Sequence, residues 1–433
     1  MAKLRKKAVW VVSSSAFAAL CQLLLLAVMA RLLSVEQLGL YALVLVFLNI
    51  AMVIQDGGVG AYLVHKQNLP RSALGAMYLL CLASGFTVAL LIIIIAPYIA
   101  AYYQQPSLPG LLKPVAATLF ISSIISSYQS IALIGEKQAQ LAKFDIASRT
   151  VGTATALLSL PAFGLEAVLY SGLLTSVIKL LLLVKITSRE HQPTWHITTE
   201  EMTSALRYGF YQTNALLINQ FRTRSDQLII GKFIGLEALA IYSLAKELIN
   251  HPTRFITPVI QNVLFPELAE KQNNVKEQLV IMKNSTSALA WVNTLIYSAM
   301  AILALPIVWL LYGSAYVSSA GILCILCCYG MLRTIGANYV SYAQAFGRSD
   351  LEFKWNLIAA ALMVLLVWLA TLTQSIHFTA MVLTLSQLGL SWLGFYFFSH
   401  ALSNLRQVPF YSITVIPICL TLLASVIGYW FYG

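Results

Sequence analysis

The sequence predicts an all-α integral membrane protein with two halves of six helices each and one additional C-terminal helix. This prediction depends on the composition, on long uncharged apolar segments, and on a repeat between the two halves of the chain. Of the 433 residues, 59% are hydrophobic and only 10% are charged, whereas soluble domains average roughly half and a quarter. Most of the chain must therefore contact lipid or other apolar helices.

Apolar segments between polar, proline or glycine residues predict thirteen membrane spans. A helix needs about 20 apolar residues to cross the hydrocarbon of a bilayer. The segments cover residues 8–30, 38–63, 73–101, 110–134, 144–162, 165–187, 204–231, 238–265, 286–312, 316–346, 353–373, 377–399 and 410–432. The first residues, MAKLRKK, resemble the charged part of a signal peptide. The following apolar run is too long for one, so we expect a retained first span.

Basic residues are distributed unevenly between the connections, which predicts the orientation in the membrane. The odd connections carry at most Arg31, Lys113 and Lys232. The even connections carry Lys66, Arg71, Lys137, Lys143, Lys185, Arg189, Lys271, Lys276, Lys283, Arg348, Lys354 and Arg406. Since cytoplasmic connections are rich in Lys and Arg, we expect a cytoplasmic N-terminus and, after thirteen spans, a C-terminus on the outer side.

The chain contains an internal repeat. Residues 31–43 (RLLSVEQLGLYAL) align with residues 232–244 (KFIGLEALAIYSL) at an offset of 201, and the same offset places Asn49 on Asn250. With six spans per half, this predicts an N-terminal lobe at 1–190, a cytoplasmic linker at 191–203, a second lobe at 204–402 and an additional helix at 403–433. Parallel repeats are typical of transporters whose lobes move around a central site.

Charged and amide side chains fall inside several predicted spans, where a charge costs roughly 2.5–3.5 kcal/mol on insertion scales. The seventh span places Gln212, Asn219, Arg222 and Asp226 on one helix face, with Arg224 nearby, and the eighth carries Lys246 and a face with Glu247, His251 and Arg254. The first half has Gln22, Asn49 and Asp56, and Arg149, Lys179 and Arg333 are further candidates.

Two interpretations of these charges stay open. Asp226 with Arg222, and Glu247 with Lys246 or His251, are candidate neutralising pairs that help helices to pack. The cations Arg222, Arg224, Lys246, Arg254 and Arg333 nevertheless outnumber the two carboxylates. The surplus favours a wet cavity for a phosphate or carboxylate, since Arg donates hydrogen bonds in pairs. Polar residues of the fourth and tenth spans are candidates to line it: Ser126, Tyr128, Gln129, Tyr339, Tyr342 and Gln344.

The remaining patterns indicate no cofactor, metal or nucleic acid. The net charge of +11 lies in connections and not on the basic face of a soluble domain. The cluster Cys324, Cys327 and Cys328 lies in an apolar segment without a second ligand cluster, so it predicts core packing. Gly57, Gly58 and Gly60 lack the other residues of a phosphate-binding loop and predict a hinge or a close helix contact.

Three segments together resemble a known family. They are residues 30–43, the DGGVG sequence at 56–60, and the block RSDQLIIGKFIGLEALAIYSL at 224–244. They resemble Wzx-type lipopolysaccharide or O-antigen flippases of the multidrug/oligosaccharidyl-lipid/polysaccharide exporter superfamily, over essentially the whole chain. The resemblance implies two MATE-like six-helix bundles around a V-shaped central cavity. A thirteenth span departs from the twelve or fourteen that are usual in this superfamily.

The resemblance also implies an activity and a site. The expected activity is transfer of undecaprenyl-diphosphate-linked oligosaccharide from the cytoplasmic to the periplasmic leaflet of a bacterial inner membrane by alternating access. The expected substrate-binding residues are Arg222, Arg224, Lys246, Arg254, Arg333, Asn219, Asn250 and Asn49. Asp226, Glu247 and Asp56 are candidates for coupling to H+ or Na+ or for charge pairing. Expected partners are membrane lipids and the polysaccharide polymerase and chain-length machinery.

Two alternatives differ in mechanism. A multidrug and toxin extrusion antiporter has the same architecture, but its organic-cation substrates favour an acidic cavity, which only Asp56, Asp226 and Glu247 could supply. A membrane-embedded polysaccharide polymerase or ligase would need a substantial outer loop with catalytic residues, and every odd connection here is short. We therefore expect a transporter without catalytic residues.

Overall fold

The computed structural model describes residues 2–56, 71–134, 137–186, 199–259, 264–271, 274–346 and 348–432. Within these ranges the regular secondary structure is helical. The chain forms two compact units, Met1–Phe221 and Arg222–Gly433, and the division falls inside α7 (Thr199–Phe233). The lobe boundaries predicted from the sequence stay a prediction, because most of the expected linker at 191–203 lies outside the described ranges.

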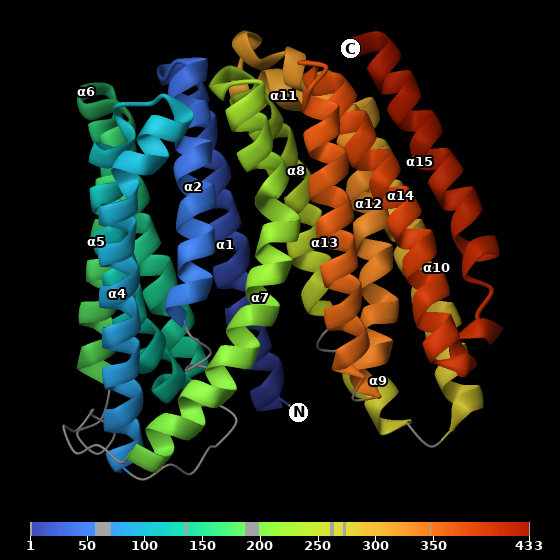
Figure 1. Cartoon of the computed structure of the whole chain (residues 1–433), viewed down its shortest axis with the longest axis horizontal. Helices are drawn as coiled ribbons and strands as arrows, with labels where there is room; N and C mark the ends of the chain where they lie inside the picture. Colours follow the sequence, from blue (N-terminus) through green and yellow to red (C-terminus); the bar gives the residue numbers. More distant parts are fainter. Residues whose placement is uncertain are drawn as a thin grey trace. The chain divides into compact units, whose positions relative to one another are not determined.

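The first unit is a helical bundle of α1 (Ala2–Leu32), α2 (Val35–Asp56), α4 (Arg71–Tyr103), α5 (Leu108–Ile134), α6 (Gln138–Ile186) and the start of α7. Helix α5 packs against α2, α4 and α6, and α1 packs against α6 (Figure 1). Gly164 interrupts α6 with a φ of 56°, three residues after Pro161. Such an angle favours glycine, so α6 contains two spans, as the predicted segments 144–162 and 165–187 require.

The second unit surrounds one nearly buried helix, α12 (Ser318–Ala345). In the apolar 18-residue segment of α12, 89% of the residues are buried, compared with 28–44% in the corresponding segments of α13, α14 and α15. The other elements are the end of α7, α8 (Leu236–Val259), α9 (Phe265–Glu270), α10 (Val275–Ile302), α11 (Ala304–Tyr312), η3 (Ser314–Tyr316), α13 (Ser349–Thr371), α14 (Ile376–Ala401), η4 (Ser403–Gln407) and α15 (Phe410–Tyr432). Cys324, Cys327 and Cys328 lie in this core, as their apolar context predicted.

Helix boundaries preserve the internal repeat. Helices α1 and α7 end at Leu32 and Phe233, and α2 and α8 begin at Val35 and Leu236, so both boundaries keep the offset of 201. In the later part of each half, α4 and α11 end at Tyr103 and Tyr312. The sequence similarity therefore reflects equivalent turns between equivalent helices.

Within the described residues, the thirteen predicted spans fall on helices, although not all are straight or uniformly apolar. Nine helices in the described part of the chain are long and apolar enough to cross a membrane, or up to ten if the pair α10 and α11 forms one span. This pair, predicted as one segment at 286–312, is bent by 67°. Helices α7 and α8 are not among the nine, and they carry the intramembrane charges that the sequence analysis identified.

The additional helix α15 is an integral part of the second unit. It packs against α10 and α12, and a Cβ atom added at Gly428 would lie 2.5 Å from the carbonyl oxygen of Ala301. Thr294 of α10 donates a hydrogen bond to the carbonyl of Pro417 in α15 (3.3 Å). Small residues and interhelical hydrogen bonds of this kind hold helices together in lipid. The helix that stands outside the sequence repeat therefore extends the bundle to which it is attached.

Candidate functional site

A short connection between α7 and α8 places their polar residues opposite one another. Helix α7 ends at Phe233 and α8 begins at Leu236, with Gly235 at a φ of 119°. This conformation is open to glycine and costly for other residues. The two helices run back along each other, so that Asp226 meets residues 16 and 20 positions later, Tyr242 and Lys246.

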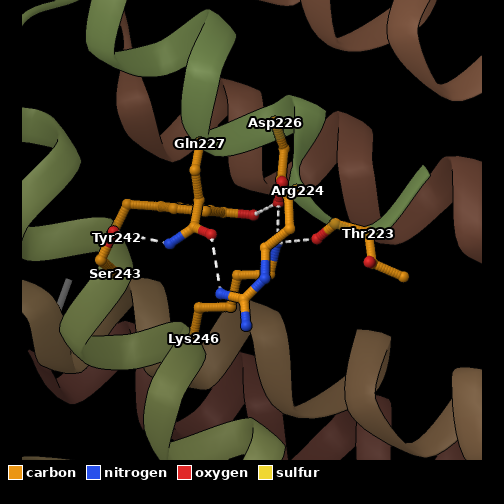
Figure 2. A network of polar contacts seen from close by, with 7 residues as sticks. All are labelled: Thr223, Arg224, Asp226, Gln227, Tyr242, Ser243 and Lys246. Carbon is orange, nitrogen blue, oxygen red and sulfur yellow. Dashed lines mark hydrogen bonds and ion pairs between the residues drawn. The ribbon is translucent and has the colours of Figure 1, made fainter. Parts of the chain in front are cut away.

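A buried network centres on Asp226 (Figure 2). Its Oδ2 accepts hydrogen bonds from the Tyr242 hydroxyl and the Lys246 ammonium, and Lys246 also donates to the carbonyl of Thr223 (2.9 Å). The side chains of Lys246 and Asp226 are only 3% and 4% exposed. Breaking a buried pair is costly because it leaves an uncompensated charge. The pair therefore fixes α7 against α8.

The network continues toward an arginine. Gln227 donates from Nε2 to Ser243 Oγ (2.9 Å) and accepts at Oε1 from Arg224 Nη1 (3.1 Å) (Figure 2). Arg224 is half-buried, so part of its guanidinium remains accessible while Gln227 orients it. A held but accessible guanidinium is suited to binding an anionic group.

Replacing Tyr242 with phenylalanine is expected to lower the free energy of unfolding by about 1.5–3 kcal/mol, the range for a hydrogen bond to a charged group. Asp226 would lose one of its two donors. Thermal unfolding of the purified protein measures the change. Tyr312→Phe is the matched control, because the Tyr312 hydroxyl is buried without a hydrogen-bond partner among the described residues. Equal stability losses in both variants would contradict a specific contribution from the network.

The pairings proposed from the sequence are partly wrong. Lys246, which the sequence offered to Glu247, pairs instead with Asp226. Glu247 accepts from Arg254 Nη2 (2.8 Å) and lies 3.7 Å from His251 Nε2, so its expected contact with His251 is present. The spacing of residues in the sequence indicates mainly which residues share one face of a helix. The partner of Asp226, in contrast, lies on the neighbouring helix.

Positive charge remains after these pairs are formed. Arg333 lies near the middle of α12, half-buried, and the hydrogen bonds and ion pairs among the described residues do not include it. It is close enough to interact electrostatically with Arg222, Arg224 and Lys246. Glu352, which interacts electrostatically with Arg222, accepts a hydrogen bond from Gln344 (2.7 Å). The second unit therefore holds several mutually repelling cations that an anion would stabilise.

A cavity of about 1110 Å³ lies within the first unit, lined by α1, α2, α5 and α6. Asp56 lines it and accepts from Ser126 Oγ (2.7 Å). Lys179 lines it too, pairs with Asp145 (2.7 Å) and donates to Gln129 (3.2 Å). The sequence analysis named Asp56, Ser126, Gln129 and Lys179 but missed Asp145. The sequence feature that could have indicated Asp145 is its position, 19 residues before the break in α6 at Gly164. Its partner Lys179 lies 15 residues after the same break.

The predicted amide residues are divided between the two units. Asn49 donates to the carbonyl of Leu45 in its own helix (2.6 Å) and is not among the residues that line the cavity. Asn219 is half-buried on the part of α7 that belongs to the first unit, and Asn250 is half-buried on α8. Tyr339 and Tyr342 are buried in the second unit, where Tyr342 donates to Gln278 (3.1 Å).

Some sequence-based candidates lie outside the described residues. Among them is the glycine cluster at 57–60, for which a hinge or a close helix contact was predicted. The side chain of Gln212 is also outside the described set. No group of three or more potential metal ligands occurs among the described residues.

Apolar helices that line a large cavity with polar residues and bury a charge network are typical of a membrane transporter. A profile described as "Polysaccharide biosynthesis protein" matches residues 28–321, more than half of the chain. The chain belongs to this family. The amylovoran biosynthesis protein AmsL of Erwinia amylovora is 30% identical over 355 residues, which cover 81% of this chain and 91% of AmsL.

Solved structures share the fold of this chain. The lipid II flippase MurJ in an inward closed conformation matches with a TM-score of 0.75 at 10% identity, covering 98% of this chain and 97% of MurJ. An inward-facing MATE family transporter of the MOP superfamily matches with a TM-score of 0.71 at 14% identity, covering 89% of this chain and 95% of that protein. The MATE-like helical fold is confirmed by these structures, and the family match confirms the resemblance to polysaccharide biosynthesis proteins.

Proposed function

We propose that the protein is a flippase that moves undecaprenyl-diphosphate-linked oligosaccharide from the cytoplasmic to the periplasmic leaflet of a bacterial inner membrane. The observation that carries this proposal is the unbalanced positive charge of the second unit. A diphosphate presents several anionic oxygens, and guanidinium groups bind such oxygens with paired hydrogen bonds. The glycan part of the proposed substrate is inferred from the family match to polysaccharide biosynthesis proteins.

In this proposal the charged residues divide into two roles. Arg224 and Arg333 bind the diphosphate, together with Arg222 and the more exposed Arg254. Lys246 acts indirectly, because its pairing with Asp226 holds α7 and α8 in position. This assignment separates direct anion binding from support of the helices.

Ion coupling, if it uses one of the three predicted carboxylates, is best placed at Asp226. Asp226 Oδ1 is buried and accepts no hydrogen bond from the described residues, whereas Asp56 and Glu247 accept from Ser126 and Arg254. A proton or Na+ at this oxygen would weaken the pair with Lys246. The proposed orientation has a cytoplasmic N-terminus and a periplasmic C-terminus, in agreement with the basic residues of the even connections.

Depletion of the protein in its native cells tests the proposal. Lipid-linked oligosaccharide is expected to accumulate in the cytoplasmic leaflet, as followed by leaflet-selective labelling, while surface polysaccharide is lost. Complementation with the wild-type gene provides the control. Normal surface polysaccharide together with new sensitivity to cationic drugs would reject the flippase proposal and favour a multidrug antiporter.

A further inference from the structure

The cavity of the first unit, which has both apolar and polar lining residues, has dimensions that suit a large ligand. Its volume of about 1110 Å³ is at the upper end of the roughly 300–1,000 Å³ range of small-molecule sites. A water molecule occupies about 30 Å³ in the liquid, so a proton or a single ion would need only a small fraction of this space. The volume therefore favours an extended ligand over an ion alone.

The charges that line this cavity are balanced, unlike those of the second unit. Two carboxylates, Asp56 and Asp145, face two cations, Arg149 and Lys179. Lys179 is already paired with Asp145 at 2.7 Å. With no net charge, the lining gives an anion no general electrostatic advantage. The cavity is therefore better suited to a neutral polar group than to a diphosphate.

Beside the donors of Arg149, Lys179 and Gln129, several hydroxyl groups of the lining are placed to accept hydrogen bonds from a ligand. Ser130, Ser148, Thr175 and Ser176 all line the cavity, and each hydroxyl donates to the carbonyl four residues earlier in its own helix, at 2.7 to 3.2 Å. Their oxygens retain lone pairs that can accept from a ligand. The two carboxylates add further acceptors. A matching ligand must carry many donors, and phosphate oxygens do not provide them.

We propose that this cavity binds the glycan portion of the transported molecule through its hydroxyl groups. Asp56 and Asp145 accept from sugar hydroxyls, and Gln129 and Lys179 add polar contacts. The ring of Tyr41 offers an apolar face against which a sugar can pack. This inference rests on the proposed flippase function and adds that glycan and diphosphate are recognised by different residues in different units.

Two glycines that line the cavity provide a steric test. A Cβ atom added at Gly172 would meet nothing within 4 Å, whereas one at Gly152 would lie 1.8 Å from Thr175 Oγ1. Gly172→Leu can therefore fill the cavity while the helix is retained, since leucine is a better helix former than glycine. Gly389→Leu is the matched control, because a Cβ atom at Gly389 in α14 also meets nothing within 4 Å.

Binding of two separate probes to the purified full chain in lipid nanodiscs distinguishes this inference from the proposed function. One probe is the free oligosaccharide released by mild acid from the lipid-linked oligosaccharide of the native cells, titrated by saturation-transfer NMR. The other is undecaprenyl diphosphate without sugar. Gly172→Leu and Asp56→Asn are each expected to weaken oligosaccharide binding at least tenfold and to leave undecaprenyl diphosphate binding unchanged. Gly389→Leu is expected to change neither.

The outcomes separate clearly. Wild-type protein that does not bind the oligosaccharide, or a Gly172→Leu variant that binds it like the wild type, overturns the glycan site. Loss of both probes in Gly172→Leu, but not in Gly389→Leu, also overturns the division between units. If the oligosaccharide results are as expected but undecaprenyl diphosphate does not bind the wild type, the glycan site is supported and the diphosphate part of the proposed function fails.

Discussion

Replacing Lys246 with methionine is expected to lower the free energy of unfolding of the protein by about 3–5 kcal/mol, the cost of leaving one buried charge without its partner. The side chains of Lys246 and Asp226 are 3% and 4% exposed, so water cannot replace the lost ammonium. Tyr242 would remain as a donor to Asp226 but would carry no positive charge. Thermal unfolding and the yield of monodisperse detergent-solubilised protein measure the effect.

Two controls make this result specific. The double variant Lys246→Met with Asp226→Asn removes both charges and retains an acceptor for Tyr242, so most of the lost stability should return. Lys271→Met breaks the exposed pair between Lys271 and Glu277, whose side chains are 41% and 50% exposed, and should leave the stability close to that of the wild type, because solvent screens such pairs. If the double variant is as unstable as Lys246→Met alone, the cost arises from packing and not from the unpaired carboxylate.

Replacing Arg224 and Arg333 together with glutamine is expected to reduce export of lipid-linked oligosaccharide by about a hundredfold or more. A hydrogen bond to a charged group contributes about 1.5–3 kcal/mol, and each 1.4 kcal/mol corresponds to a factor of ten. Stability should not fall greatly, because Arg333 has no ion pair among the described residues to lose. Surface polysaccharide in cells that carry only the variant provides the measurement, normalised to the amount of folded protein.

The matched control removes the same number of charges elsewhere. Lys271 and Arg348 are basic residues outside the candidate site, and their side chains are 41% and 44% exposed. Lys271→Gln with Arg348→Gln should therefore export at close to the wild-type rate. Normal export by a well-folded Arg224→Gln, Arg333→Gln variant would reject these arginines as the diphosphate site. Equal losses in both double variants would indicate a general effect of net charge.

Much of the fold was predictable because it depends on local, periodic properties of the sequence. Apolar length predicted the nine helices that are long and apolar enough to cross a membrane in the described part of the chain. The pair of helices within α6 was separated correctly at Gly164, where the backbone adopts an angle that favours glycine. The repeat at offset 201 located the equivalent turns at Ser34 and Gly235. The break between α10 and α11 was not predicted, because the apolar sequence continues through the 67° bend.

The candidate site was predictable only in part. The spacing of Asp226 and Arg222 on one helix suggested a pair, but the partner of Asp226 is Lys246 of the next helix. Asp145 was not identified as polar lining of the first unit, although Lys179 was. Helical periodicity indicates which residues share one face of a helix. It does not indicate which face the neighbouring helix turns toward them, or at which depth in the membrane the residues of the two helices meet.

The sequence by itself determined that this protein is a helical membrane protein with an internal repeat, more intramembrane cations than carboxylates, and the features of a polysaccharide exporter. Apolar length, charge and repeated residues are properties of the chain and do not depend on its packing. The tertiary structure alone decided that Lys246 is neutralised by Asp226, that Arg333 forms no ion pair with the described residues, and that Asp56 and Asp145 line a charge-balanced cavity of the first unit. Side-chain packing between helices that are distant in the sequence sets the rotation and the depth of each helix. The rotation and the depth in turn determine which residue becomes the partner of each buried charge.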